Sequence, residues 1–408
     1  SAIVLPLIWL KFTTSTGVNA AVAAYVMLNN DNGHKDEGKS DYISLGLTNN
    51  FFPDHTCCVI AANYNYLQNN TTNAEKFLAG YHDAVQFVQN ALKDTSSEDY
   101  KWLINFSKTK VPGLTEQEVK DALSNIAYLY ADGNDGNLSG LNKDIQSLVG
   151  GLSDVKALQK DVPDTEAFAN NFVDATYMKN AITNKDSLKD GTATVKVAVI
   201  SGDIHQIAVH VGIEKGTFNN YGVTVQISNA TNGGGIATSL INGDAQLGFL
   251  GAPPATINMI NFGYIDSEAV QDTSKAFQLV ARVNSEGSGI YINSNVLDDP
   301  NASVLKRNGT AFFSVDGDEY TVSSANAKAW GGLVYGTPGT TSIQHIQLLT
   351  LATEMGLKIK QYMVGTSIES DTLYWVTNLA NYQTITGDPT INAGIIWEPQ
   401  FQRVIQES

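Results

Sequence analysis

VKVAVISGDIHQIAVHVGIEKGTFNNYGVTVQI, the stretch from residue 195 to residue 227, predicts a strand, a loop, a helix, a turn and a second strand in that order. Its β-branched run VKVAVI (195–200) is typical of a buried parallel strand. SGD (201–203) ends that strand, the helix that follows stops at Gly216, and VTVQI (223–227) forms the next strand. The pattern indicates a βαβ unit with a crossover helix. Its first loop lies at the carboxyl end of a strand, where open α/β sheets bind ligands.

The sequence after this unit repeats the same design. A glycine triplet (233–235) opens the helical run IATSLINGDAQ, and the apolar run LGFLG (247–251) predicts another strand. APP (252–254) then begins a further helix, because proline suits a first helical turn. The triplet lacks the G-x-G-x-x-G spacing of a dinucleotide-binding loop, so it is no nucleotide fingerprint.

The order of these segments resembles the solute-binding proteins of ABC transporters, of the type that binds nitrate, sulfonates, taurine or pyrimidine precursors. The resemblance rests on VGIEKGTF, GVTV, the Gly-rich turn and INGDAQLGFLGAPPA. It extends to ARVNSEGSGIYINSN (281–295), which resembles the strand passing toward the second lobe, to the Gly-Thr/Ser loop in YGTPGTTSIQHIQLLTLATEMGL (335–357), and to the strand NAGIIWEPQ (392–400). It implies an α/β, two-lobed periplasmic-binding-protein-like fold that closes on a small molecule by a hinge.

Residues 42–183 resemble the end of the same family rather than its beginning. ISLGL and CCVIAA predict strands, and the apolar spacing over residues 73–92 predicts a helix. Thr115 to Glu118 is a capping box before another helix. Residues 141–150 and 165–182 predict further amphipathic helices.

The chain is therefore expected to be circularly permuted. In family order, the solute-binding lobes of residues 195–408 would come first and the returning segment 42–183 would follow, joined by the polar linker 184–194. Permutation is tolerated where chain termini lie close together on a surface. We expect the strands of the two segments to share a sheet. A second polar linker, 29–41, precedes the globular region.

Residues 1–28 are apolar on every face apart from Lys11 and Thr13–Gly17, and they predict a long hydrophobic N-terminal α-helix. Roughly 20 residues suffice to span a bilayer, but the interior polar patch suits a lipid-facing span poorly. The segment stands first, without Met or a basic region before it, and this pattern resembles type IV pilins and archaeal pilin-like proteins. In those proteins the leader is cut before the hydrophobic segment, which then packs in a filament core. A signal-anchor helix in a membrane is the alternative.

Composition indicates an acidic protein that is exposed outside the cell. The formal net charge of −16 argues against nucleic acid as a partner, because phosphate needs a basic surface. Seven Asn-x-Ser/Thr sequons favour an extracellular, glycosylated surface. They are Asn69, Asn70, Asn105, Asn137, Asn229, Asn301 and Asn308.

The two cysteines, Cys57 and Cys58, are adjacent. They cannot form a metal site alone, and a disulfide between them would be strained. Two buried, reduced thiols on a strand are the favoured interpretation, because free Cys is among the most buried residue types. The segment FFPDHTCCVIAA (51–62) also resembles the family's Pro-x-His-x-Cys-Cys-Val strand.

The candidate ligand site is a cleft walled by strand-end loops and helix N-termini, whose unpaired N–H groups favour an anionic ligand. One wall is expected from Ser201, Gly202, Asp203, His205, Gln206, Asn232, Gly233, Gly234, Gly235, Gly251 and Ala252. The other is expected from Thr337, Gly339, Thr340, Thr341, Ser342 and Glu398, with His55 approaching from the returning segment. Trp397 could equally stack on a ligand or belong to the core. In the alternative interpretation these residues only shape turns.

No enzyme is predicted, because no nucleophile elbow or metal-spaced cluster accompanies Asp203 and His205. No cofactor or metal is expected. The sequence predicts a cell-surface, extracellular solute-binding-like protein displayed on a helix that assembles with copies of itself through residues 1–28, as a pilin-like filament subunit. The alternative is a membrane-tethered receptor that delivers its ligand to an ABC permease.

Overall fold

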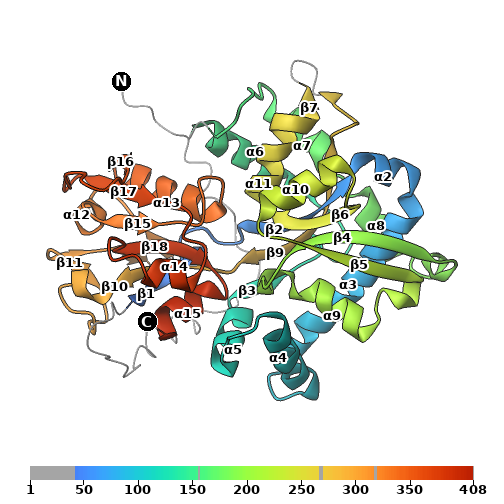
Figure 1. The fold of residues 1–408 in the computed structure, drawn as a ribbon, viewed down its shortest axis with the longest axis horizontal. Helices are drawn as coiled ribbons and strands as arrows, with labels where there is room; N and C mark the ends of the chain where they lie inside the picture. The colour runs from blue at the N-terminus through green and yellow to red at the C-terminus, as the bar shows by residue number, and fades with distance from the viewer. Residues whose placement is uncertain (1–41, 155–156, 266–269, 317–318, 408) are drawn as a thin grey trace. The chain divides into compact units, whose positions relative to one another are not determined.

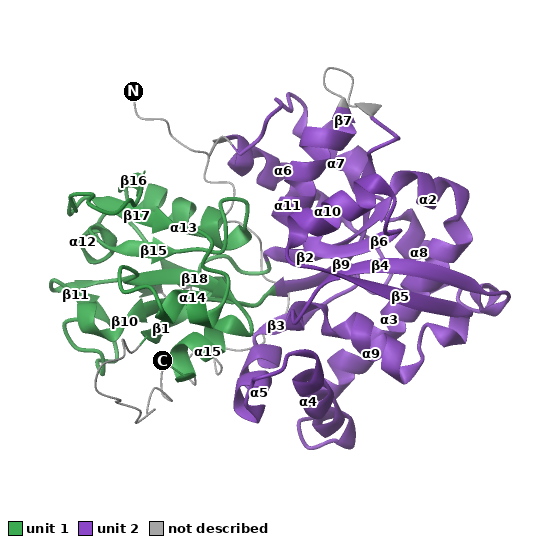
Figure 2. Ribbon diagram, viewed as in Figure 1, with its two compact units in different colours: residues 1–54, 286–408 green, residues 55–285 purple. Residues whose placement is uncertain are grey.

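The computed structural model describes residues 42–407 apart from 155–156, 266–269 and 317–318. The helix predicted over residues 1–28 and the linker 29–41 lie outside the described residues. The predicted α/β class is confirmed: among the described residues, helices accompany two six-stranded mixed sheets and three short antiparallel strand pairs (Figure 1). The chain divides into two compact units, residues 1–54 with 286–408 (unit 1) and residues 55–285 (unit 2), coloured in Figure 2.

Unit 2 is built on a six-stranded sheet with the order β3-β9-β2-β6-β4-β5. β4 pairs in parallel with β5 and β6, and β2 pairs antiparallel with β6 and β9. The expected shared sheet is therefore confirmed, because β2 comes from the segment 42–183 and β6 from the segment after residue 195. The strands are β2 (Thr56–Asn63), β3 (Ile126–Tyr128), β4 (Ala193–Ile200), β5 (Val223–Ala230), β6 (Leu247–Gly251) and β9 (Phe277–Glu286), with a small hairpin of β7 (Tyr264–Ile265) and β8 (Val270–Gln271).

Helices cover both faces of this sheet. Figure 1 shows α3 and α9 on one side, with α6, α10 and α11 on the other. The predicted βαβ unit is present, and α9 ends where expected, because Gly216 takes the left-handed conformation (φ 73°) that glycine tolerates best. The helices are α2 (Tyr64–Asn69), α3 (Thr71–Lys93), α4 (Glu98–Lys110), α5 (Glu116–Ser124), α6 (Ser139–Asp154), α7 (Thr165–Phe172), α8 (Thr176–Thr183), α9 (Ile207–Lys215), α10 (Gly233–Asn242) and α11 (Ala252–Asn258).

Aromatic packing between α3 and the βαβ unit fixes one face of unit 2. Phe77 stacks on Phe218 with ring centroids 4.9 Å apart and meets Phe249 edge to face. A Cβ at Gly80 would lie 2.6 Å from the ring of Phe218, so only glycine permits this approach. The segment before residue 184 and the segment after residue 195 thus share one core.

Two local expectations need correction, and a third is confirmed. The amphipathic span 165–182 is two helices, α7 and α8, because Val173 forms a β-bridge with Leu279 between them. The linker 184–194 ends early, since its last two residues already belong to β4. The capping box is present, with Thr115 and Glu118 each accepting the other's backbone N–H.

Unit 1 carries its own six-stranded sheet, with the order β1-β10-β18-β15-β17-β16. β15 pairs in parallel with β17 and β18, while β10 pairs antiparallel with β1 and β18. Its main strands are β1 (Tyr42–Leu47), β10 (Ser288–Asn293), β15 (Val334–Gly336), β16 (Lys358–Gln361), β17 (Thr372–Val376) and β18 (Ala393–Trp397). Short pairs are formed by β11 (Lys306–Arg307) with β12 (Thr310–Ala311) and by β13 (Ser314–Asp316) with β14 (Glu319–Thr321).

Two apolar clusters line the two faces of the unit 1 sheet. One is centred on Trp330 and Tyr335, whose rings stack 5.7 Å apart, and the other on Tyr291 and Phe401. The helices that bury them are α12 (Ala327–Trp330), α13 (Ile343–Glu354), α14 (Tyr382–Thr386) and α15 (Gln400–Glu407). The run 281–295 is divided into β9 and β10 at Glu286 and Gly287, which both have positive φ.

Candidate functional site

The carboxyl end of β4 is the point in the unit 2 sheet where neighbouring strands lead to opposite faces. β5 and β6 flank β4 on opposite sides, and the crossover helices α9 and α10 lie on opposite faces of the sheet (Figure 1). The loops that leave β4 and β6 therefore diverge. Such a topological switch point is where open α/β sheets bind ligands.

An Asp–His pair occupies this switch point. After β4, Ser201 and Gly202 are exposed, and Gly202 takes a positive φ (73°) that turns the chain into a short 3₁₀ turn over Ile204–Gln206. The carboxylate Oδ1 of Asp203 accepts the backbone N–H of His205 at 3.0 Å and the ring Nδ1–H of the same residue at 2.9 Å. Because a carboxylate only accepts, it fixes the imidazole with its proton on Nδ1. The pair is nearly dry, with side-chain exposures of 9 % for Asp203 and 2 % for His205.

Two side chains from antiparallel strands join the Asp–His pair. Cys57 lies at the start of β2 and Asn284 near the end of β9, and both are buried. The hydrogen bond from the Cys58 thiol lowers the pKa of Cys57 to about 7, although burial and the charge of Asp203 raise it. His205 and Asn284 act in the same direction as Cys58. Both cysteines are free thiols, as the sequence favoured.

The side chain of Gln206 makes structural hydrogen bonds between strands. Its Oε1 accepts the N–H of Ile200, and its Nε2 donates to the carbonyl of Phe249, each at 2.9 Å. The side chain therefore joins the end of β4 to β6 in a fully buried position. Both ends of the amide are occupied, so ligand contact through this side chain would break a bond between strands.

The remaining unit 2 candidates are explained largely by helix starts. Asn232 caps α10 by accepting the N–H of Gly235 at 3.0 Å. A Cβ at Gly233 would lie 2.7 Å from Pro254, so glycine allows α10 and α11 to approach. Gly234 is half-buried, and Gly251 with Ala252 begins α11 at the end of β6. His55 is buried directly before β2.

The unit 1 candidates lie in the loop after β15, in an arrangement similar to that of the loop after β4 in unit 2. Thr337 Oγ1 lies 3.0 Å from Nδ1 of His345, and Ser342 caps α13 by accepting the N–H of His345 at 3.2 Å. Gly339 is half-buried and Thr340 and Thr341 are exposed. His345 packs edge to face on Trp375, and burial lowers its pKa to about 4.

Glu398 is a buried residue at the end of β18, not a solvent-exposed acid. It is fully buried after β18, its backbone N–H donates to the carbonyl of Gly287, and its Oε1 accepts from Gln402 at 2.8 Å. Trp397 is half-buried and packs against the apolar cluster around Tyr291. The unit 1 and unit 2 candidates thus gather in separate groups within their own units. That they face one another stays a prediction.

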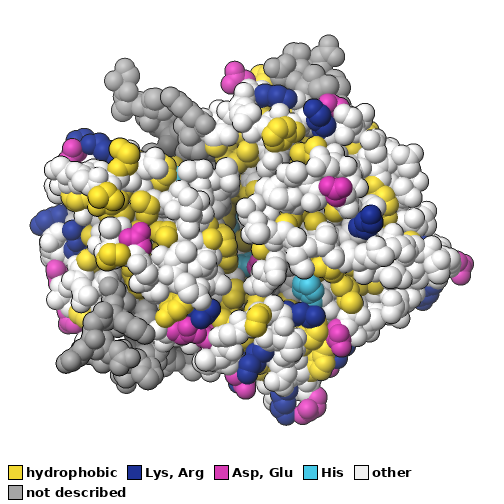
Figure 3. All heavy atoms as spheres, in the orientation of Figure 1, with side chains coloured by type: hydrophobic (Ala, Val, Ile, Leu, Met, Phe, Trp, Pro, Cys, Tyr) yellow, Lys and Arg dark blue, Asp and Glu magenta, His cyan; other side chains and the backbone are white. Residues whose placement is uncertain are grey.

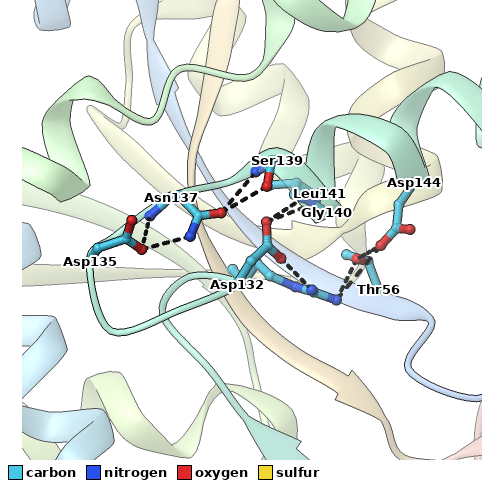
Figure 4. A network of polar contacts seen from close by, with 9 residues as sticks. Thr56, Asp132, Asp135, Asn137, Ser139, Gly140, Leu141 and Asp144 are labelled. Atoms are coloured by element: carbon cyan, nitrogen blue, oxygen red, sulfur yellow. Dashed lines mark hydrogen bonds and ion pairs between the residues drawn. The ribbon is translucent and has the colours of Figure 1, made fainter. Parts of the chain in front are cut away.

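Sequence reasoning missed a buried ionic network beside the switch point (Figure 4). Arg282 donates to Asp132 at 2.6 Å and to the hydroxyl of Thr56 at 2.7 Å, and Thr56 donates in turn to Asp144. The second oxygen of Asp132 accepts two N–H groups at the start of α6. Two carboxylates already balance this guanidinium, so it lends no uncompensated charge to an anionic ligand. The only signal in the sequence was a single Arg among the apolar residues of β9.

The face in Figure 3 shows charged side chains scattered singly, with no large basic patch. Five of the sequon asparagines are exposed, and Asn70 and Asn137 are half-buried. Within the described ranges, no group of three or more His, Cys, Asp or Glu side chains is arranged to hold a metal ion. None of the helices described here has the length and apolar character needed to cross a bilayer.

Comparison with known proteins adds no family. No family model matches the chain, and no curated protein or solved structure is significantly similar to it.

Proposed function

We propose that this chain is an extracellular solute-binding protein that holds a small molecule at the carboxyl end of β4. One observation carries the proposal. The buried Asp203–His205 pair, Cys57 and Asn284 converge where the sheet order reverses. A few polar groups set in an apolar surround are what small-molecule sites use to orient a ligand. Because Asp203 holds the ring of His205 in one orientation, the site favours a small ligand that carries polar groups.

Binding would be accompanied by closure of the two units on the ligand, as the resemblance to ABC-transporter solute-binding proteins implies. The loop from Thr337 to Ser342, with His345 beneath it, is the surface of unit 1 proposed to complete the site. The periplasmic-binding-protein-like, circularly permuted architecture is part of this proposal. It is supported by the shared sheet of β2, β6 and β4.

Titration calorimetry with taurine, nitrate and a 4-aminopyrimidine tests ligand binding, since these represent the ligand classes of the resembled family. We expect one of them to bind, and Asp203→Asn to weaken its binding at least tenfold, because the substitution removes the charge that orients His205. Asp161→Asn is the matched control, on an exposed loop. Equal affinities of the two variants would refute the site.

We further propose that residues 1–28 assemble copies of the chain into a pilin-like filament, since an apolar run of this length must be buried in lipid or against other copies. Ala24→Lys places a charge in its small-residue stretch and is expected to abolish fibres in electron micrographs. Ala325→Lys, on an exposed turn, is expected to leave them unchanged. Intact fibres with Ala24→Lys would favour the alternative, a membrane-tethered receptor for an ABC permease.

A further inference from the structure

The vicinal thiols lie in a distorted part of the unit 2 sheet. Successive side chains on a regular strand point to opposite faces. Here the register with β9 passes from Thr56, opposite Ser285, to Cys58, opposite Asn284, so that Cys57 is an extra residue in the strand. A bulge of this kind re-aims a side chain. The two Sγ atoms consequently lie 3.8 Å apart, within contact of one another.

The surroundings distinguish the two sulfurs. The hydrogen bond with Cys58 lowers the pKa of Cys57 to about 7, although burial raises it; His205 and Asn284 lower it further, and Asp203 raises it. The hydrogen bond to Cys57, then burial, and then the charges of Cys57 and Asp203 hold the pKa of Cys58 well above its usual range. Tyr81 of α3 is the further titratable group next to Cys58. Cys57 is thus the nucleophile and Cys58 the protonated partner that holds it.

We propose that Cys57 and Cys58 form a reversible dithiol–disulfide site that exchanges with small, low-molecular-weight disulfides. The thiolate of Cys57 attacks one sulfur of the reagent disulfide, forming a mixed disulfide and releasing one reagent thiolate. Cys58 then loses its proton to the released thiolate or to water and attacks Sγ of Cys57. The mixed bond breaks, the second reagent thiolate leaves, and two electrons have passed from the protein to the reagent.

Closure of the ring is strained, which makes the site reversible. Cα atoms joined by a trans peptide lie about 3.8 Å apart, below the usual range for disulfide-bonded cysteines. Strained disulfides are more easily reduced and are the labile ones in proteins. The site therefore reports and responds to the thiol–disulfide balance around the protein. This inference shares Cys57 and its neighbours with the proposed ligand site, but it does not require that any ligand binds there.

The test uses the folded, full chain with 2-hydroxyethyl disulfide, followed by intact mass and iodoacetamide trapping. The wild-type protein is expected to lose two hydrogen atoms, keep no adduct, resist iodoacetamide and recover both thiols with dithiothreitol. Cys58→Ser should keep one reagent group on Cys57, because the resolving thiol is missing. Cys57→Ser should react at least tenfold more slowly than Cys58→Ser.

His205→Gln tests the role of the imidazole as a positioning residue. We expect the pH midpoint of adduct formation in a Cys58→Ser background to rise, with the rate at high pH unchanged. A stable wild-type adduct, equal rates for the two Cys→Ser variants, or thiols that react only after denaturation would overturn the proposal. The wild-type mass measurement decides between these outcomes even where a variant does not fold.

Discussion

The loops after β4 and β15 each hold a buried histidine, but they do so with different polar partners. Each follows a parallel strand, leads into a helix, and places a buried histidine beside a buried glutamine, His205 with Gln206 in unit 2 and His345 with Gln344 in unit 1. The Nδ1 atom of His205 donates to a carboxylate, whereas that of His345 meets the hydroxyl of Thr337. Two similar loops therefore orient a buried imidazole in different ways, one with a carboxylate and the other with a hydroxyl.

The difference separates the roles of the two units. A carboxylate that holds an imidazole prepares it to accept or give a proton or hydrogen bond at Nε2. A dry imidazole packed on Trp375 is held neutral and acts mainly as a packing and hydrogen-bonding group. We infer that unit 2 supplies the chemically selective surface and unit 1 the more passive one.

The largest expected difference concerns the two glutamines. Gln206→Leu removes bonds to two buried backbone groups, the N–H of Ile200 and the carbonyl of Phe249. Leaving a buried polar group unpaired costs about 1–3 kcal/mol, so we expect a loss of about 3 kcal/mol in the free energy of unfolding. Gln344→Leu removes one bond, to the hydroxyl of Ser288, and should cost about 1 kcal/mol.

Urea denaturation followed by circular dichroism measures both changes. Ser201→Ala, at an exposed position in the same loop as Gln206, is the control and is expected to remain within about 0.5 kcal/mol of the wild-type protein. Equal losses for the two glutamine variants would mean that the strand-joining role assigned to Gln206 is wrong.

The second expected effect is a pH dependence originating in unit 1. Burial lowers the pKa of His345 to about 4, while the unfolded chain titrates near its ordinary value of about 6.5. Between these pH values the unfolded state binds the extra proton. The stability is therefore complete above pH 6.5 and declines as pH falls toward 4, by about 2–3 kcal/mol for this group.

His345→Asn is expected to reduce the dependence of the free energy of unfolding on pH between 4 and 6.5, since asparagine can accept a hydrogen bond without titrating. His210 of α9 is the matched group in unit 2, because burial also lowers its pKa to about 4. His210→Asn should remove a similar slope, and the double variant both. Urea midpoints measured between pH 4 and 7.5 report the slopes. An unchanged slope in His345→Asn would contradict the neutral, buried imidazole.

Local signals in the sequence predicted much of unit 2. Four local signals are confirmed: the β-branched run of β4, Gly216 as a helix end, the glycine triplet 233–235 as a helix start, and the Thr115–Glu118 capping box. Each depends on neighbours within a turn or a strand. Even the shared sheet followed, from the order of segments in the resembled family.

The parts that could not be predicted depend on long-range partners. In the sequence, Gln206 looks like a polar loop residue, and its bond to Phe249 of β6 is known only from the structure. Arg282 likewise looks like an isolated cation, and its partners Asp132 and Asp144 are known only from the structure. The bulge at Cys57 is set by the register with β9, which no local pattern encodes. His345 was passed over because a lone histidine in an apolar helix gives no sign of its partners.

The smallest expected effects come from the N-caps of α10 and α13, Asn232 in unit 2 and Ser342 in unit 1. Asn232 is exposed and makes one capping bond to α10, so Asn232→Ala should cost about 0.5–1 kcal/mol and Asn232→Gly only a few tenths. Ser342 accepts the N–H of His345 and also donates to the carbonyl of Gly339 at 2.8 Å. Because Ser342→Ala removes both bonds, it should cost about 1–1.5 kcal/mol. Urea midpoints again give the values. If Asn232→Ala cost more than Ser342→Ala, the two hydrogen bonds of Ser342 would not stabilise the unit 1 loop more than the single cap of Asn232 stabilises α10.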